Sequence, residues 1–81
     1  MEEVEMLLAD LNKCIAKKES ELLKIGPYNI FTRSYLKLRH SEIKLFEIDF
    51  YIYRNTELLT PTIIEKMEKE YNRIKTEIGK I

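Results

Sequence analysis

Few residues of this chain could take part in covalent chemistry, and they are scattered. The chain has one cysteine, Cys14, and one histidine, His40. A reactive thiol needs nearby positive charge to lower its pKa, whereas other cysteines behave as small apolar side chains and are usually buried. A histidine that acts as a general base needs a nucleophile and an orienting group, and no motif of that kind surrounds His40. We interpret Cys14 as a packing residue and His40 as a surface residue.

Three carboxylates, Glu42, Glu47 and Asp49, come nearest to an acid–base pair or a metal cluster. Hard metal ions need several oxygen ligands that converge on one point. On a helix these three side chains point in different directions, and on a strand Glu47 and Asp49 share the solvated face. The sequence also has no glycine-rich phosphate loop, no CxxC pair and no HExxH motif. We therefore expect no enzyme active site, no metal and no cofactor, and we infer no small-molecule substrate.

A stripe of basic residues is the strongest chemical signal. Arg33, Lys37, His40 and Lys44 recur at 4-3-4 spacing, with Arg39 nearby, and a basic helix face can bind phosphates. Arg33, Lys37, Arg39 and Lys44 are therefore candidate nucleic-acid contacts. However, the chain has 14 basic and 14 acidic residues and a formal net charge of zero, whereas general polyanion binders carry a positive excess. A solvated face is the favoured interpretation, and nucleic-acid binding is the alternative.

Aromatic residues are concentrated in the middle third of the chain, and aromatic side chains are enriched at protein interfaces. Core packing accounts for Phe46 and Phe50, which leaves Tyr35, Tyr51 and Tyr53 as candidate partner-interface residues. A chain of 81 residues buries a limited share of its surface, so disulfides, a metal or a partner usually add stability. Here a partner or unusually good helix packing remains. We expect a homo-oligomer or a larger protein partner.

Composition places the chain among globular proteins. Apolar residues make up 44% and charged residues 35%, which is too apolar for a disordered chain and too charged for a membrane protein. No apolar run approaches the roughly 20 residues that span a bilayer, and the acidic segment Met1–Glu5 does not resemble a targeting signal. The lone cysteine suggests a reducing compartment, so we expect a cytoplasmic location. The richness in Lys, Glu and Ile is common in thermophilic proteins and also in any solvated helical protein.

The elements that must position these residues include two strongly periodic segments. Residues 2–24 combine acidic residues at the start, an apolar stripe at 4-3 spacing and a following Gly26-Pro27, which predicts a helix. A second helix is predicted from Thr60 as N-cap and Pro61 at the first helical position. The two stripes consist of Val4, Leu8, Leu11, Ile15, Lys18, Leu22 and Ile25, and of Ile64, Met67, Tyr71, Ile74, Ile78 and Ile81.

The middle segment, residues 29–55, fits two structures. As a helix it begins after Asn29 as N-cap and presents a wide apolar arc to two neighbouring helices. As a β-hairpin, the alternating residues 46–53 pair with residues 30–38. The connecting residues 39–42 include no Gly, Asn or Pro, which tight hairpins prefer, and this favours the helix. The arc consists of Phe31, Tyr35, Leu38, Leu45, Ile52 and Tyr53, extended by Leu36, Ile43, Phe46 and Phe50.

Together these patterns predict a single all-α domain, residues 1–81, with three helices in an up-down-up arrangement. A helix–β-hairpin–helix domain is the alternative. Because the first two helices are antiparallel, Lys18 comes close to Glu42, and we expect these two charges to pair. The predicted function is a small, non-enzymatic protein–protein interaction module or accessory subunit that self-associates. A small nucleic-acid-binding or regulatory protein is the second hypothesis.

Overall fold

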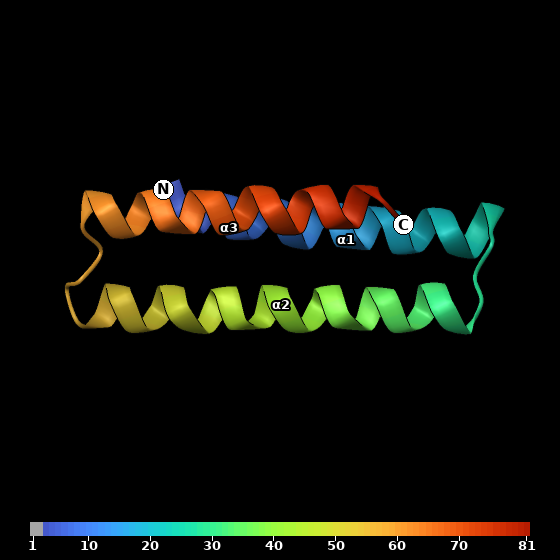
Figure 1. The fold of residues 1–81 in the computed structure, drawn as a ribbon, viewed down its shortest axis with the longest axis horizontal. Helices are drawn as coiled ribbons and strands as arrows, with labels where there is room; N and C mark the ends of the chain where they lie inside the picture. Colours follow the sequence, from blue (N-terminus) through green and yellow to red (C-terminus); the bar gives the residue numbers. More distant parts are fainter. Residues whose placement is uncertain (1–2) are drawn as a thin grey trace.

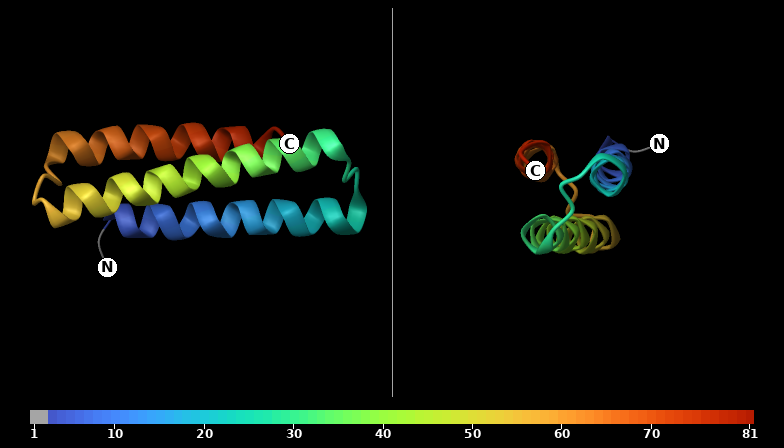
Figure 2. Two further views of the ribbon diagram at one scale, coloured as in Figure 1. Left: turned by 90° about the horizontal axis from the view of Figure 1, so that it is seen from below. Right: turned by 90° about the vertical axis from the view of Figure 1, so that its right-hand side faces the viewer.

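Three helices joined by short connections form the computed structural model, which describes residues 3–81. Helix α1 spans Glu3–Ile25, α2 spans Ile30–Asn55 and α3 spans Pro61–Gly79. Consecutive helices are antiparallel, and α1 and α3 lie next to each other on the same side of α2 (Figure 1). In the end-on view of Figure 2 the three helices occupy the corners of a triangle. Residues 3–81 contain no strand. The all-α prediction is confirmed, and the hairpin alternative is wrong.

Helix α1 begins and ends where the local sequence favours it. Glu3 and Glu5 lie in its first turn, where carboxylates interact favourably with the positive end of the helix dipole; Glu2, which was expected to add to them, lies outside the described residues. Gly26 follows the helix at φ 81°, in the left-handed region that glycine enters without a steric penalty. The predicted glycine stop is therefore confirmed.

Side-chain caps define the start of the other two helices. The Asn29 side-chain oxygen accepts hydrogen bonds from the backbone N–H groups of Phe31 at 3.0 Å and Thr32 at 3.1 Å, and the Thr32 hydroxyl accepts from the Asn29 N–H at 2.9 Å. This reciprocal arrangement satisfies N–H groups that have no partner inside the helix. Thr60 caps α3, and Pro61 occupies its first turn. Both predicted caps are confirmed.

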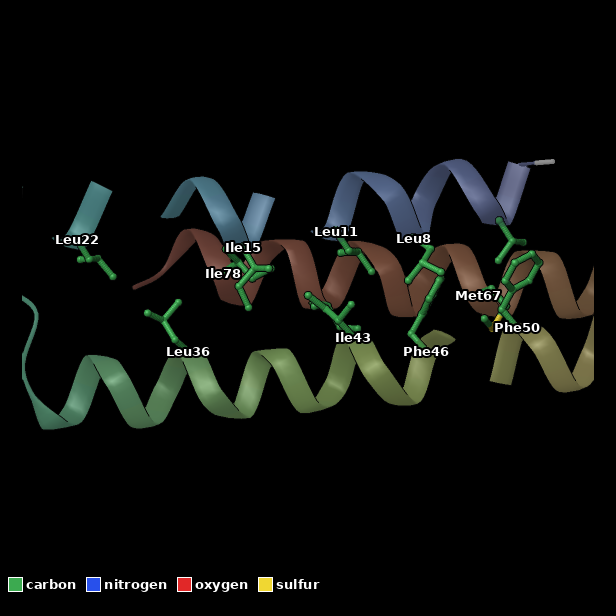
Figure 3. Packing of buried hydrophobic residues seen from close by; sticks show 12 residues of the cluster. Leu8, Leu11, Ile15, Leu22, Leu36, Ile43, Phe46, Phe50, Met67 and Ile78 are labelled. Atoms are coloured by element: carbon green, nitrogen blue, oxygen red, sulfur yellow. The ribbon is translucent and has the colours of Figure 1, made fainter. Parts of the chain in front are cut away.

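One strip of apolar side chains fills the space between the three helices, as Figure 3 shows. It consists of Val4, Leu8, Leu11, Ile15, Leu22, Leu36, Ile43, Phe46, Phe50, Met67, Ile74 and Ile78. Ile25 was expected to join this strip but is 85% exposed. The reason is its position at the last residue of α1, in a part of the bundle that α3 does not reach (Figure 2).

Only part of the apolar arc of α2 enters this core. Leu36, Ile43, Phe46 and Phe50 are buried, and Figure 3 shows the first three directed toward α1 and α3. Tyr35 and Tyr53 are half-buried, and Phe31, Leu38, Leu45 and Ile52 lie on the exposed side of the helix. The expectation that two neighbours cover the whole arc is therefore wrong, because α1 and α3 both contact α2 from the same side.

Candidate interaction site on helix α2

Helix α2 has a second apolar face, which α1 and α3 leave exposed. Phe31, Leu38, Leu45 and Ile52 follow one another at intervals of seven residues, and they are 81%, 52%, 61% and 53% exposed. An interval of seven returns to nearly the same side of a helix, with a drift of about 20°. Ile48, which is also exposed, lies beside this row. We call these five residues the outer face; their spacing is that of a coiled-coil seam.

The outer face follows most of the length of α2. At 1.5 Å per residue, residues 31–52 extend over about 30 Å. In Figure 1 both other helices lie on one side of α2, and no other helix lies on the opposite side. Single exposed apolar residues are ordinary on protein surfaces, but contiguous apolar patches mark interaction sites.

The two edges of the outer face carry opposite charge. Lys37 and Lys44 form one edge, and Glu42 and Asp49 form the other, each pair seven residues apart. Both lysines and Asp49 are exposed, while Glu42 is half-buried. The Lys44 ammonium lies 3.0 Å from a Glu47 carboxylate oxygen on the same helix. An amphipathic seam with charged edges is typical of helices that select a partner helix and its direction.

The three tyrosines proposed as interface residues differ in their surroundings. Tyr51 is exposed, and its ring lies 5.6 Å from that of Phe50. Tyr53 is half-buried and packs against the core. Tyr35 is also half-buried, and its hydroxyl donates a hydrogen bond to Glu77 of α3 at 2.5 Å. Of the three, Tyr51 is therefore the one that the structure leaves exposed, next to Ile52 of the outer face.

The basic stripe is divided between different surroundings. Arg33 and Lys37 are exposed and line a shallow hollow between α1 and α2. The same hollow contains His40 and Glu19, and the imidazole Nε2 lies 3.0 Å from the Glu19 carboxylate. An acidic group therefore stands among the cations, which weakens the potential that a polyanion would meet.

Arg39 is not on the exposed basic side, which corrects its place among the candidate nucleic-acid contacts. Its side chain is buried between α2 and α3, with the guanidinium carbon 4.7 Å from the centre of the Tyr35 ring. Its Nη1 atom lies 2.8 Å from Glu42 and 3.7 Å from Glu77. A buried guanidinium needs such compensation. A sequence signal for this position existed, because Leu36, Arg39 and Ile43 follow one another at 3-4 spacing, as residues on one side of a helix do.

Glu42 pairs with α3 instead of α1. Its carboxylate binds the guanidinium of Arg73, which also binds Glu70 at 2.5 Å. The hydrogen bond from Arg73 lowers the pKa of Glu70. The expected Lys18–Glu42 pair is therefore wrong, because Glu42 lies on the side of α2 that faces α3.

A second polar cluster joins α1 to α3. The Tyr71 hydroxyl donates a hydrogen bond to Asp10 at 2.5 Å, and the Lys75 ammonium donates to Asp10 and to Tyr71, each at 3.0 Å. These contacts lower the pKa of Asp10. Burial, aided by the negative charge of Asp10, raises the pKa of Cys14. The thiol is thereby held in its protonated form, which is a poor nucleophile.

The part of the chain that the structure describes, residues 3–81, has neither a cluster of metal ligands nor a helix that could span a membrane. No group of three or more His, Cys, Asp or Glu side chains in this part of the chain is placed to hold a metal ion. Likewise, no helix within it combines the length and apolar character needed to cross a membrane. A groove of about 480 Å³ lies between α2 and α3, and it shares Leu45 and Asp49 with the outer face and its acidic edge.

No family model, no curated protein and no solved structure matches this chain. The outer face is thus identified from its own residues. A sequence signal for it existed, because Phe31, Leu38 and Leu45 form one heptad row while Leu36 and Ile43 belong to another. The sequence pattern predicts that both rows contact the neighbouring helices, whereas α2 meets these helices on one side.

Proposed function

We propose that this protein is a non-enzymatic interaction module that self-associates through the outer face of α2. The observation that carries the proposal is the row Phe31, Leu38, Leu45 and Ile52, four large apolar side chains that are each more than half exposed. Full burial of one such side chain contributes about 1.5–3 kcal/mol. Contact between two of these rows removes all eight side chains from water along the length of the helix.

The size and charge of the chain support a second copy as the partner. A chain of 81 residues forms a small core, and association is a common way to add stability at this size. Its formal net charge is zero, so two copies meet without the long-range repulsion that a strongly charged chain would have. A larger protein that presents an apolar helix is the other candidate partner.

The absence of activated groups among the candidate catalytic residues supports a non-enzymatic role. A nucleophilic cysteine requires a lowered pKa, and that of Cys14 is raised. His40 is exposed, and its contact is with Glu19 rather than with a nucleophile. The histidine therefore lacks the neighbour that general-base chemistry needs.

Light scattering on a sizing column tests the proposal. We expect a mass of twice 9.7 kDa at high protein concentration, and a melting temperature that rises with concentration, because association stabilises the folded state. Leu45→Glu should return the protein to the monomer while its far-UV circular dichroism stays helical. Met6→Glu is the matched control, since Met6 is also exposed, at 55%, but lies on α1.

Two results would contradict self-association through this face. One is a wild-type protein that stays monomeric up to millimolar concentration. The other is a Leu45→Glu variant that associates as strongly as the Met6→Glu variant, because the charge would then have no effect on the contact.

A further inference from the structure

The outer face can be described with heptad positions. If the row Phe31, Leu38, Leu45 and Ile52 occupies the a positions, the remaining seam positions follow from the sequence. The d positions are Ser34, Ser41, Ile48 and Asn55, the e positions are Tyr35, Glu42 and Asp49, and the g positions are Ile30, Lys37, Lys44 and Tyr51. One edge of the seam is therefore basic at its centre, and the other edge is acidic.

We infer that two copies pair with their α2 helices parallel and in register, an inference that rests on the proposed self-association. In a parallel pair, each g residue lies next to the e residue that follows it by five positions on the second copy. Lys44 then meets the exposed Asp49 of the second copy. Lys37 comes next to Glu42 of the second copy, whose carboxylate is already bound by Arg39 and Arg73 of its own chain. Both contacts join opposite charges, and the two-fold symmetry repeats each of them.

The N-terminal end of the seam fits the same arrangement. Ile30 is 72% exposed at the beginning of α2, and in the parallel register it meets the ring of Tyr35 from the second copy. An apolar g residue thus meets an aromatic e residue, as each basic g residue meets an acidic e residue. The pattern of edge residues is therefore self-complementary in this direction along the helix.

The antiparallel arrangement lacks this complementarity. When two helices run in opposite directions, each edge meets the equivalent edge of the other copy. The edge with Lys37 and Lys44 would then face itself, and so would the edge with Glu42 and Asp49. Like charges placed side by side repel, so the direction of pairing follows from the edges rather than from the apolar row.

The small polar residues of the seam can also lie in a contact. The Ser41 hydroxyl donates a hydrogen bond to the Lys37 carbonyl at 3.1 Å. Because this bond is made within the helix, burial of Ser41 leaves no unsatisfied donor. Small side chains at Ser34 and Ser41 leave room for the larger Phe31, Leu38 and Leu45 of both copies.

Disulfide formation tests the direction of pairing. In the full chain with Cys14→Ser, Ser34→Cys places the only thiol at a d position. In the parallel pair the two thiols face each other, whereas in antiparallel pairs the equivalent residues lie roughly 15–25 Å apart, beyond the Cα separation of about 7 Å that a disulfide tolerates. Arg33→Cys in the same background is the control, because Arg33 is exposed but lies off the seam.

The inference predicts that mild oxidation links Ser34→Cys at least tenfold faster than Arg33→Cys. Equal rates in a protein that is dimeric by light scattering would overturn the parallel arrangement and leave the proposed function intact. A protein that is monomeric by light scattering would overturn both.

Charge variants should change the dissociation constant in opposite ways for a parallel and an antiparallel pair. For the parallel pair, Lys44→Glu should raise the dissociation constant about tenfold, and the further change Asp49→Lys should restore it. For an antiparallel pair, Lys44→Glu would relieve repulsion along the basic edge and lower the dissociation constant. That lowering, measured by sedimentation equilibrium, would overturn the inference.

Discussion

Helix α2 carries one row of apolar side chains toward α1 and α3 and a second row away from them. Leu36, Ile43 and Phe50 make up the inner row, also at intervals of seven residues, and they are 3%, 3% and 1% exposed. The outer row consists of Phe31, Leu38, Leu45 and Ile52, each more than half exposed. The two rows have similar residue types and the same period, so neither property separates them.

What separates the rows is whether the chain itself supplies the contact. The inner row is buried by residues of α1 and α3, whereas the outer row has no counterpart among residues 3–81. The basic residues beside the two rows also differ in whether their own chain covers them. Arg39 is buried and compensated by carboxylates, while Lys37 on the outer edge is exposed. The inner row should therefore determine folding, and the outer row association.

Truncation of one aromatic residue in each row is the strongest test of this difference. Phe50→Ala should lower the free energy of unfolding by about 3–5 kcal/mol, because it leaves a cavity in the packed core. Phe31→Ala should change it by less than about 0.5 kcal/mol, as expected for an exposed site. Urea denaturation followed by circular dichroism, at a concentration where the protein is monomeric, measures both. Similar losses in the two variants would contradict the division into two roles.

Removal of one arginine from each side of α2 should give a smaller difference. Arg39→Ala should lower the free energy of unfolding by about 2 kcal/mol, because it takes a charged partner from Glu42 and Glu77. Arg33→Ala, at an exposed position, should stay within about 0.5 kcal/mol of the wild type. If Arg39→Ala lowers the free energy of unfolding no more than Arg33→Ala does, the buried guanidinium contributes little to the packing of α2 against α3.

The N-cap of α2 should affect both rows together, since they share one helix. Asn29→Ala removes the acceptor for two backbone N–H groups and should lower the free energy of unfolding by about 1 kcal/mol. Arg33→Ala is the control, since Arg33 is exposed in the same helix and lies off the seam. Hydrogen exchange would locate the loss in the first turns of α2. A loss spread equally over α3 would argue against a local capping effect.

Acid should affect the contacts that surround the inner row. The pKa values of Asp10, Glu70 and Glu77 are lowered in the folded protein, for Asp10 and Glu77 mainly by hydrogen bonds from tyrosine hydroxyls and for Glu70 by Arg73. Their stabilisation is therefore present above the ordinary values of 3.8 to 4.5 and is lost as the pH falls through the lowered values. We expect the melting temperature to fall below about pH 5.

A single substitution can separate one of these contributions. Tyr71→Phe removes the largest cause of the lowered pKa of Asp10, so the melting temperature of this variant should depend less steeply on pH in the acid range. Glu68 has the opposite effect on the pH dependence of stability, because a hydrogen bond with Glu3 and the charge of Glu3 raise the pKa of Glu68. If the melting temperature of Tyr71→Phe depends on pH as steeply as that of the wild type, the contact between Asp10 and Tyr71 does not contribute to the acid sensitivity of the fold.

The local features of this protein were predictable because their causes are local. The caps Asn29 and Thr60 and the stop at Gly26 act through hydrogen bonds and backbone angles within a few residues. Residues 39–42 include no Gly, Asn or Pro, and this local property favours a helix over a tight hairpin in the middle segment. The buried positions of α1 and α3 all belong to the stripes that the helical period predicts, although Ile25 of the first stripe is exposed.

The sequence by itself therefore predicted the first and last helices, the caps and the apolar rows, and it favoured a helix over a hairpin for residues 29–55. Only the tertiary structure decided which row of α2 is buried, that Arg39 faces α3, and that Glu42 binds Arg73 rather than Lys18. These outcomes depend on the rotation of α2 about its own axis against two helices that contact it from one side. That rotation is set by the combined packing of residues far apart in the chain, and the helical period does not encode it.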